Sequence, residues 1–210
     1  MIDAAGEGAV DAAPLLPPSP GKDFLCNQVT GLQATGQWYA AGFEQDGLDG
    51  SHWQAKTQHQ AYIEKWADPA HPVWNQALTS PCAQGSDSPD RVVFVGFSPP
   101  SMTEEVWEKA LVADIRALQG KYSALKEIDV MSMVRAPGNQ LCPGNSDPLV
   151  MIAPYIDQAI EAAVRQFPGL ARVGPKIYAP NCEAFVANDT DLVPDGAAAV
   201  ARMVAAFFAP

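Results

Sequence analysis

One segment of the chain, Arg91–Phe97, reads RVVFVGF and has no polar residue after its first position. A strand with one face in water alternates apolar and polar residues, and this segment does not. Continuous apolar strands are typical of parallel sheets, which helices cover on both faces. The segment therefore predicts a central parallel strand that is buried on both sides.

Strand and helix patterns alternate around this segment. Thr103, followed by Glu104 and Glu105, predicts the start of a helix, because a threonine oxygen caps free N–H groups and acidic residues favour the first turn. Further strands are predicted at Asp23–Gly31, Trp53–Thr57, Glu127–Met133 and Leu170–Tyr178. Further helices are predicted at Trp38–Glu44, Ala61–Trp66, Pro148–Phe167 and Asp195–Phe208. This alternation indicates an α/β domain with a mostly parallel, doubly wound sheet of about five strands.

The chain divides into two parts by composition. Residues 1–22 are rich in Ala, Gly and Pro and lack both a basic start and a continuous apolar segment, so they do not form a signal peptide as they stand. We expect a flexible tether there, of the kind that follows a removed export signal or a lipid anchor. At 210 residues, the chain is long enough for one sizeable core, and we expect residues 23–210 to form a single domain.

The charge of the chain restricts its partners. A net charge of -11 opposes binding to nucleic acid or to an anionic membrane surface, so neutral or cationic ligands fit better. No apolar run is long enough to span a bilayer. We expect a monomer that binds a small molecule or a glycan.

Four cysteines, Cys26, Cys82, Cys142 and Cys182, contain no Cys-x-x-Cys pair. An even number without metal-ligand spacing favours two disulfides, although four buried thiols remain an alternative. Disulfides would indicate export, to the exterior or the periplasm, or to the cell surface as a lipoprotein. Four cysteines allow three pairings, of which we favour Cys26–Cys82 with Cys142–Cys182, since the last two lie in loops expected at one edge of the sheet.

Ligands of doubly wound sheets bind at loops that follow the carboxyl ends of strands. In these loops Arg135 and Asn139 are polar candidates for ligand contact, although a solvated Pro-Gly turn explains them equally well. Trp38 is a candidate sugar platform, but core packing is the commoner role of a tryptophan. The acidic residues around Asp191 do not match a calcium loop, so we expect no metal site.

The end of the chain carries a sequence block that resembles a known family. Asn188-Asp189-Thr190-Asp191-Leu192, followed by Pro194-Asp195-Gly196, resembles the Asp-x-x-His-Leu loop and Pro-x-Gly turn of SGNH (GDSL-type) hydrolases. Gly31 and Thr35 match the family's Gly-Asp-Ser-x-Thr opening, and Gly96 matches the glycine of its Gly-x-Asn-Asp loop. The resemblance covers residues 23–210. It implies a three-layer α/β/α sandwich with a flavodoxin-like sheet, and ester hydrolysis without a cofactor.

The four catalytic positions of that family carry other residues here. Gln33 occupies the position of the serine nucleophile, Ser98 that of the oxyanion asparagine, and Asn188 and Asp191 those of the Asp and His. A glutamine amide cannot be activated to attack an acyl carbon. Ser98 is a candidate donor, but we favour a turn residue before the following prolines.

Two functional hypotheses follow from this substitution of the catalytic set. The first is an exported pseudoenzyme that keeps the cleft to bind a neutral ligand such as a glycan. The second is a divergent esterase or carbohydrate O-deacetylase that uses Thr35 as nucleophile with His59 or Asp191 as base. A threonine in such a loop more often caps a helix, and a histidine such as His59 more often lies on the surface. A purely structural exported domain is the alternative if neither binding nor hydrolysis is found.

Overall fold

The computed structural model describes residues 23–43, 48–98, 102–140, 142, 152–186 and 190–209. Two predictions concern residues outside these ranges. They are the tether, residues 1–22, and Asn188, which stands at the position of the catalytic Asp in the SGNH pattern.

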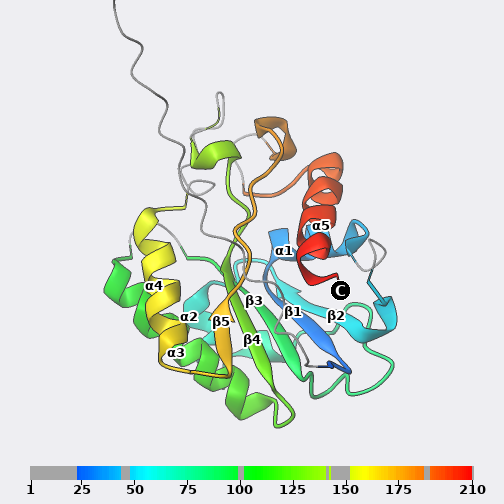
Figure 1. Cartoon of the computed structure of the whole chain (residues 1–210), viewed down its shortest axis with the longest axis vertical. Coiled ribbons are helices and arrows are strands. Elements are labelled where there is room, and N and C mark those ends of the chain that lie inside the picture. Colours follow the sequence, from blue (N-terminus) through cyan, green and yellow to red (C-terminus); the bar gives the residue numbers. More distant parts are fainter. Residues whose placement is uncertain are drawn as a thin grey trace, which may run out of the picture.

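Five parallel strands form one sheet, in the order β2-β1-β3-β4-β5 (Figure 1). The strands are β1 Asn27–Leu32, β2 Trp53–Gln58, β3 Arg91–Gly96, β4 Glu127–Ser132 and β5 Ala171–Val173. The apolar segment identified in the sequence is the central strand β3, and all its residues are buried. The parallel α/β prediction is confirmed. β5 is shorter than the predicted Leu170–Tyr178.

Helices cover both faces of the sheet. Figure 1 shows α1 and α5 on one side and α3 and α4 on the other, which gives the three-layer α/β/α sandwich. The helices are α1 Gln33–Ala40, α2 Ile63–Trp66, α3 Glu104–Lys121, α4 Pro154–Arg165 and α5 Pro194–Phe208. Single 3-10 turns lie at Gly50–His52, Pro72–Asn75, Pro137–Asn139 and Cys182–Ala184. No helix of the described part is long and apolar enough to cross a membrane.

Helix starts agree with the sequence in one case and differ in another. The Thr103 oxygen accepts from the N–H of Val106, so the predicted N-cap of α3 is confirmed. α5 starts one residue before the predicted Asp195: Val193 is its N-cap, Pro194 begins the helix, and Asp195 lies in the first turn. A proline suits the first helical position because its missing N–H would have no partner there. An acidic side chain in the first turn still favours the helix dipole.

All five tryptophans belong to the core. Trp38 is 1% exposed and packs edge to face against Phe43. A sugar needs an open ring face, so this placement corrects the prediction that Trp38 binds a ligand. The other four, each at most 5% exposed, are Trp53, Trp66, Trp74 and Trp107. Core packing therefore accounts for the high tryptophan content.

Both disulfides are present with the favoured pairing. Cys26–Cys82 joins the residue before β1 to the connection that precedes β3, and Cys142–Cys182 joins the two loops that follow β4 and β5. The described residues contain no free cysteine. Two disulfides indicate a compartment outside the cytosol.

A buried charge cluster crosses the face of the sheet that α5 covers. Asp129 on β4 accepts from the Nε atoms of Arg91 on β3 at 2.8 Å and of Arg172 on β5 at 2.6 Å. Burial raises the pKa of Asp129, and the two guanidinium groups oppose that shift. The Arg91 guanidinium also lies 4.5 Å from the ring centroid of Phe208. The cluster ties three strands to the last helix.

A second buried carboxyl group lacks such partners. Asp114 on α3 is 0% exposed, and neither of its oxygens has a hydrogen-bond partner among the described residues. Burial, and then the nearby charge of Glu64, raises the pKa of Asp114 well above its ordinary 3.8. The folded protein therefore holds a proton there that the unfolded chain releases above about pH 4.

We predict that Asp114→Asn raises the free energy of unfolding at pH 7. Each unit of pKa difference costs the wild type about 1.4 kcal/mol, and the amide removes this cost. Because the folded pKa is raised, wild-type stability falls as pH rises from the ordinary pKa through the folded one. Denaturant unfolding from pH 3 to pH 8 measures this effect. The free energy of unfolding of Asp114→Asn is expected to exceed that of the wild type at pH 7, and the difference is expected to vanish near pH 3.

Asp129→Asn is the matched control for this prediction. It removes the charge that pairs with Arg91 and Arg172, so stability at pH 7 is expected to fall, by about 3–5 kcal/mol for a broken buried pair. An equal loss at every pH for Asp114→Asn would contradict the assignment of Asp114 as a protonated, unpartnered group.

Candidate functional site

The first strand leads directly into the first helix at the carboxyl edge of the sheet. β1 ends at Leu32 and α1 begins at Gln33, so the predicted helix start at Trp38 is wrong. Gly31 is needed for packing, because a Cβ there would lie 2.8 Å from the carbonyl oxygen of Val95 on β3. The close approach of β1 and β3 fixes where α1 starts.

Two glutamines of α1 contact the loop that precedes α5. The Gln33 Nε2 atom donates to Asp191 Oδ2 over 3.4 Å, and the Gln37 Oε1 atom accepts from the backbone N–H of Leu192 over 2.7 Å. The two residues at the predicted nucleophile and histidine positions therefore lie next to each other. Gln33 and Asp191 are both half-buried.

The terminal loop is folded back on itself before α5 begins. The N–H of Val186 donates to the carbonyl of Asp191 over 2.8 Å, and that of Val193 donates to the carbonyl of Ala184 over 2.9 Å. Gly196, in the first turn of α5, packs on this loop, and a Cβ there would lie 2.3 Å from the Ala184 oxygen. The Pro-Asp-Gly sequence suggested that Gly196 is needed for a turn. The structure shows instead that close packing against Ala184 requires a glycine there.

The candidate hydroxyl groups at the carboxyl edge of the sheet are buried and contact other side chains of the protein. Thr35, a residue of α1, is 2% exposed and its hydroxyl lies beside Gly31 of β1, where no ester carbonyl can reach it. The Ser98 hydroxyl is buried, 2.9 Å from Glu64 Oε1 and 2.6 Å from the Met102 sulfur. Gly96 packs against Ile63 and α3. These contacts do not favour Thr35 as a nucleophile or Ser98 as an oxyanion donor.

The histidines do not approach these hydroxyl groups. His59 is exposed in the turn after β2. The Nδ1 atom of His71 accepts from the N–H of Val73 over 3.1 Å and caps a 3-10 turn. Among the hydrogen bonds of the described residues, none joins an imidazole to a serine or threonine hydroxyl.

Arg135 and Asn139, predicted to contact a ligand, bind other parts of the chain. Arg135 is 3% exposed and forms an ion pair with Asp157 of α4. Burial raises the pKa of Asp157, but Arg135 and Lys176 outweigh it and hold that pKa below its ordinary value. The Asn139 amide donates to the carbonyl of Ile152 over 2.7 Å and accepts from its N–H over 2.8 Å. These contacts give both residues a structural role. Arg135 is too buried to offer much surface to a ligand, whereas ligand contact by the half-buried Asn139 stays a prediction.

A hollow of about 340 Å³ lies between α1 and β2 and includes Gln33. It is called the α1–β2 hollow below. Amide, hydroxyl and small apolar groups line it, and none of its lining side chains carries a charge. The lining residues are Gln33, Gly36, Gln37, Tyr39, Ala40, Ala55, Thr57 and Thr79. A volume of this size is within the range of small-ligand sites.

Most of this lining was not singled out from the sequence. Gln37 follows Gln33 by four residues and therefore shares its helix face, which is the one signal that the sequence offered. Thr57 and Thr79 come together through backbone hydrogen bonds between Ala55 and Thr79, and no local pattern predicts that contact.

Comparison of the chain with protein-family models and with curated proteins finds no match. The resemblance to SGNH hydrolases therefore remains a prediction from the residues that carry it.

We predict that Gly196→Ala destabilises the protein. The added methyl group meets backbone atoms of Ala184, so α5 and the terminal loop must shift, at a cost of about 1–3 kcal/mol or more for overpacking. Gly120→Ala is the control, because no atom lies within 4 Å of its added Cβ, and stability there is expected to rise by roughly 0.5–1 kcal/mol. Thermal unfolding of both variants measures the difference. Equal stability of the two would contradict the close packing.

Proposed function

We propose that the carboxyl edge of this sheet binds a neutral, hydroxyl-rich ligand such as a glycan and does not hydrolyse it. The observation that carries the proposal is the uncharged α1–β2 hollow, which includes the residue at the nucleophile position, Gln33. A glutamine amide offers both donors and acceptors, and a threonine hydroxyl does the same, so the lining matches sugar hydroxyl groups.

The charge of the protein supports a neutral ligand. With a net charge of -11, the field around the molecule repels anions at long range. A hollow without charged lining side chains has no cation to overcome that repulsion. Neutral sugars are not subject to it.

The residues at the family's catalytic positions support binding over hydrolysis. Acyl transfer needs an activated nucleophile and a base within hydrogen-bond reach. At these positions the amide of Gln33 instead faces the carboxylate of Asp191, and the nearby Thr35 hydroxyl is buried. The geometry of the positions is compatible with an SGNH-like scaffold in which the reacting groups have been replaced.

The proposed setting is the exterior of the cell or the periplasm. Two disulfides support an oxidising compartment. We further propose that the protein is either released or held at the cell surface as a lipoprotein.

Glycan-array binding of the labelled protein, followed by NMR titration with the best neutral glycan, tests the proposal. Gln33→Ala removes one hydrogen-bonding side chain from the α1–β2 hollow, so affinity is expected to fall about 2–10-fold, as for the loss of a typical neutral hydrogen bond. Gln166→Ala is the matched control, because Gln166 is an exposed glutamine directly after α4 whose amide donates to Glu108. The proposal would be contradicted if no glycan bound, or if Gln33→Ala and Gln166→Ala lowered the glycan affinity equally.

Short p-nitrophenyl esters test the esterase alternative. We expect no turnover above that of heat-denatured protein, because the hydrogen bonds of the described residues join no imidazole to the hydroxyl group of Thr35 or Ser98. Turnover that Thr35→Ala abolishes would replace the binding proposal with a divergent esterase.

A further inference from the structure

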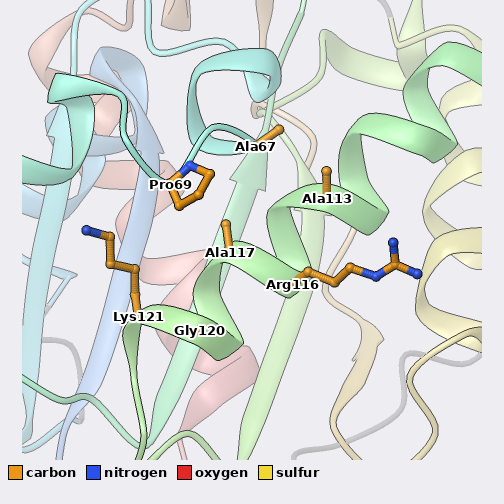
Figure 2. A pocket seen from close by; sticks show the side chains of 7 residues that line it. All are labelled: Ala67, Pro69, Ala113, Arg116, Ala117, Gly120 and Lys121. Carbon is orange, nitrogen blue, oxygen red and sulfur yellow. The ribbon is translucent and has the colours of Figure 1, made fainter.

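A second, larger hollow lies away from the candidate site, beside the C-terminal half of α3. It measures about 480 Å³ and is called the α2–α3 hollow below. Figure 2 shows it between the chain that follows α2 and the exposed side of α3. Its lining residues are Ala67, Pro69, Ala113, Arg116, Ala117, Gly120 and Lys121.

The floor of the α2–α3 hollow is apolar. Ala113 and Ala117 point from α3 toward the hollow, and Pro69 faces them from the other wall (Figure 2). These side chains are too short to fill the space between α3 and the chain that follows α2. An apolar ligand body of a few carbon atoms would cover surface that water now contacts, which is favourable at about 25 cal/mol per Å².

Two cations flank this apolar floor. Arg116 and Lys121 leave α3 in opposite directions, and Lys121 extends on the side of Pro69 (Figure 2). Both are exposed, and neither forms an ion pair with a carboxylate within the described part of the chain. Within the described part of the chain, their charges are therefore not neutralised by a bound carboxylate.

Lys121 lies near Lys56 and the ring of Trp74, and the charge of Asp87 also acts on Lys56. The Lys121 Nζ atom lies 5.6 Å from the ring centroid of Trp74. Lys56 lies close by, and its Nζ atom donates to the carbonyls of Trp74 and Gln76. Burial lowers the pKa of Lys56, and the charge of Lys121 lowers it further. An anion held at Lys121 would reduce the repulsion between these two ammonium groups.

A basic residue in the last turn of a helix also stabilises the helix dipole, and this accounts for a lysine at position 121 by itself. The dipole does not account for an apolar depression of ligand size next to that lysine. The combination of an apolar floor and an unpaired ammonium group selects a ligand that has both an apolar body and one negative charge.

We propose that the α2–α3 hollow binds small aliphatic carboxylates, with the carboxylate on Lys121 and the alkyl chain on Ala113, Ala117 and Pro69. Arg116 borders the other side and adds positive potential. This site is independent of the α1–β2 hollow and of the proposed glycan binding.

Titration of the ¹⁵N-labelled protein with sodium hexanoate, followed by NMR, tests this proposal. We expect saturable shifts of the backbone amides of Ala113, Ala117 and Gly120, with an affinity in the millimolar range. Acetate lacks the alkyl chain and 1-hexanol lacks the charge, so each is expected to bind at least fivefold more weakly.

Lys121→Gln is expected to weaken hexanoate binding at least threefold. Lys109→Gln is the matched control, because Lys109 is an exposed lysine of the same helix that pairs with Glu105. Both positions are exposed, so both variants are expected to fold. Equal shifts with hexanoate and hexanol, shifts centred elsewhere, or an affinity that Lys121→Gln leaves unchanged would each overturn the proposal.

Discussion

Two glutamine side chains on α1 hold the terminal loop against the carboxyl edge of the sheet. Gln37 accepts from the backbone of Leu192 and Gln33 donates to Asp191, which joins residues about 155 positions apart in the chain. The packing of α1 on α5 brings these two segments of the chain together. The close packing of Gly196 on Ala184 holds α5 against the same terminal loop. The candidate site exists only while these contacts persist.

The same contacts determine what chemistry the site supports. An amide that faces a carboxylate forms a hydrogen bond, and neither group attacks an ester in the way that a base-activated hydroxyl does. The adjoining α1–β2 hollow adds amides and hydroxyls but no charged side chain. Recognition of a neutral ligand therefore fits the groups present, whereas hydrolysis would need a nucleophile and an imidazole that the described residues do not bring together.

The parts of the structure that the sequence predicted depend on local physics. The continuous apolar segment of β3 specified a doubly covered parallel strand, and the Thr103 cap specified the start of α3. The placement of Cys142 and Cys182 in neighbouring loops specified their disulfide. The errors arose where tertiary contacts decide. Trp38 lies in the core because α1 packs on β2 and α5, and Arg135 is buried because Asp157 of α4 reaches it. Neither contact leaves a signal in the neighbouring sequence.

Reaction with a fluorophosphonate, which modifies activated hydroxyl groups, tests the central claim most directly. Intact-mass spectrometry of the treated native protein is expected to show no covalent adduct, because the proposed site holds the amide of Gln33 against the carboxylate of Asp191 and contains no activated hydroxyl group. A stoichiometric adduct on one serine or threonine at the carboxyl edge of the sheet, absent after unfolding, would contradict the account.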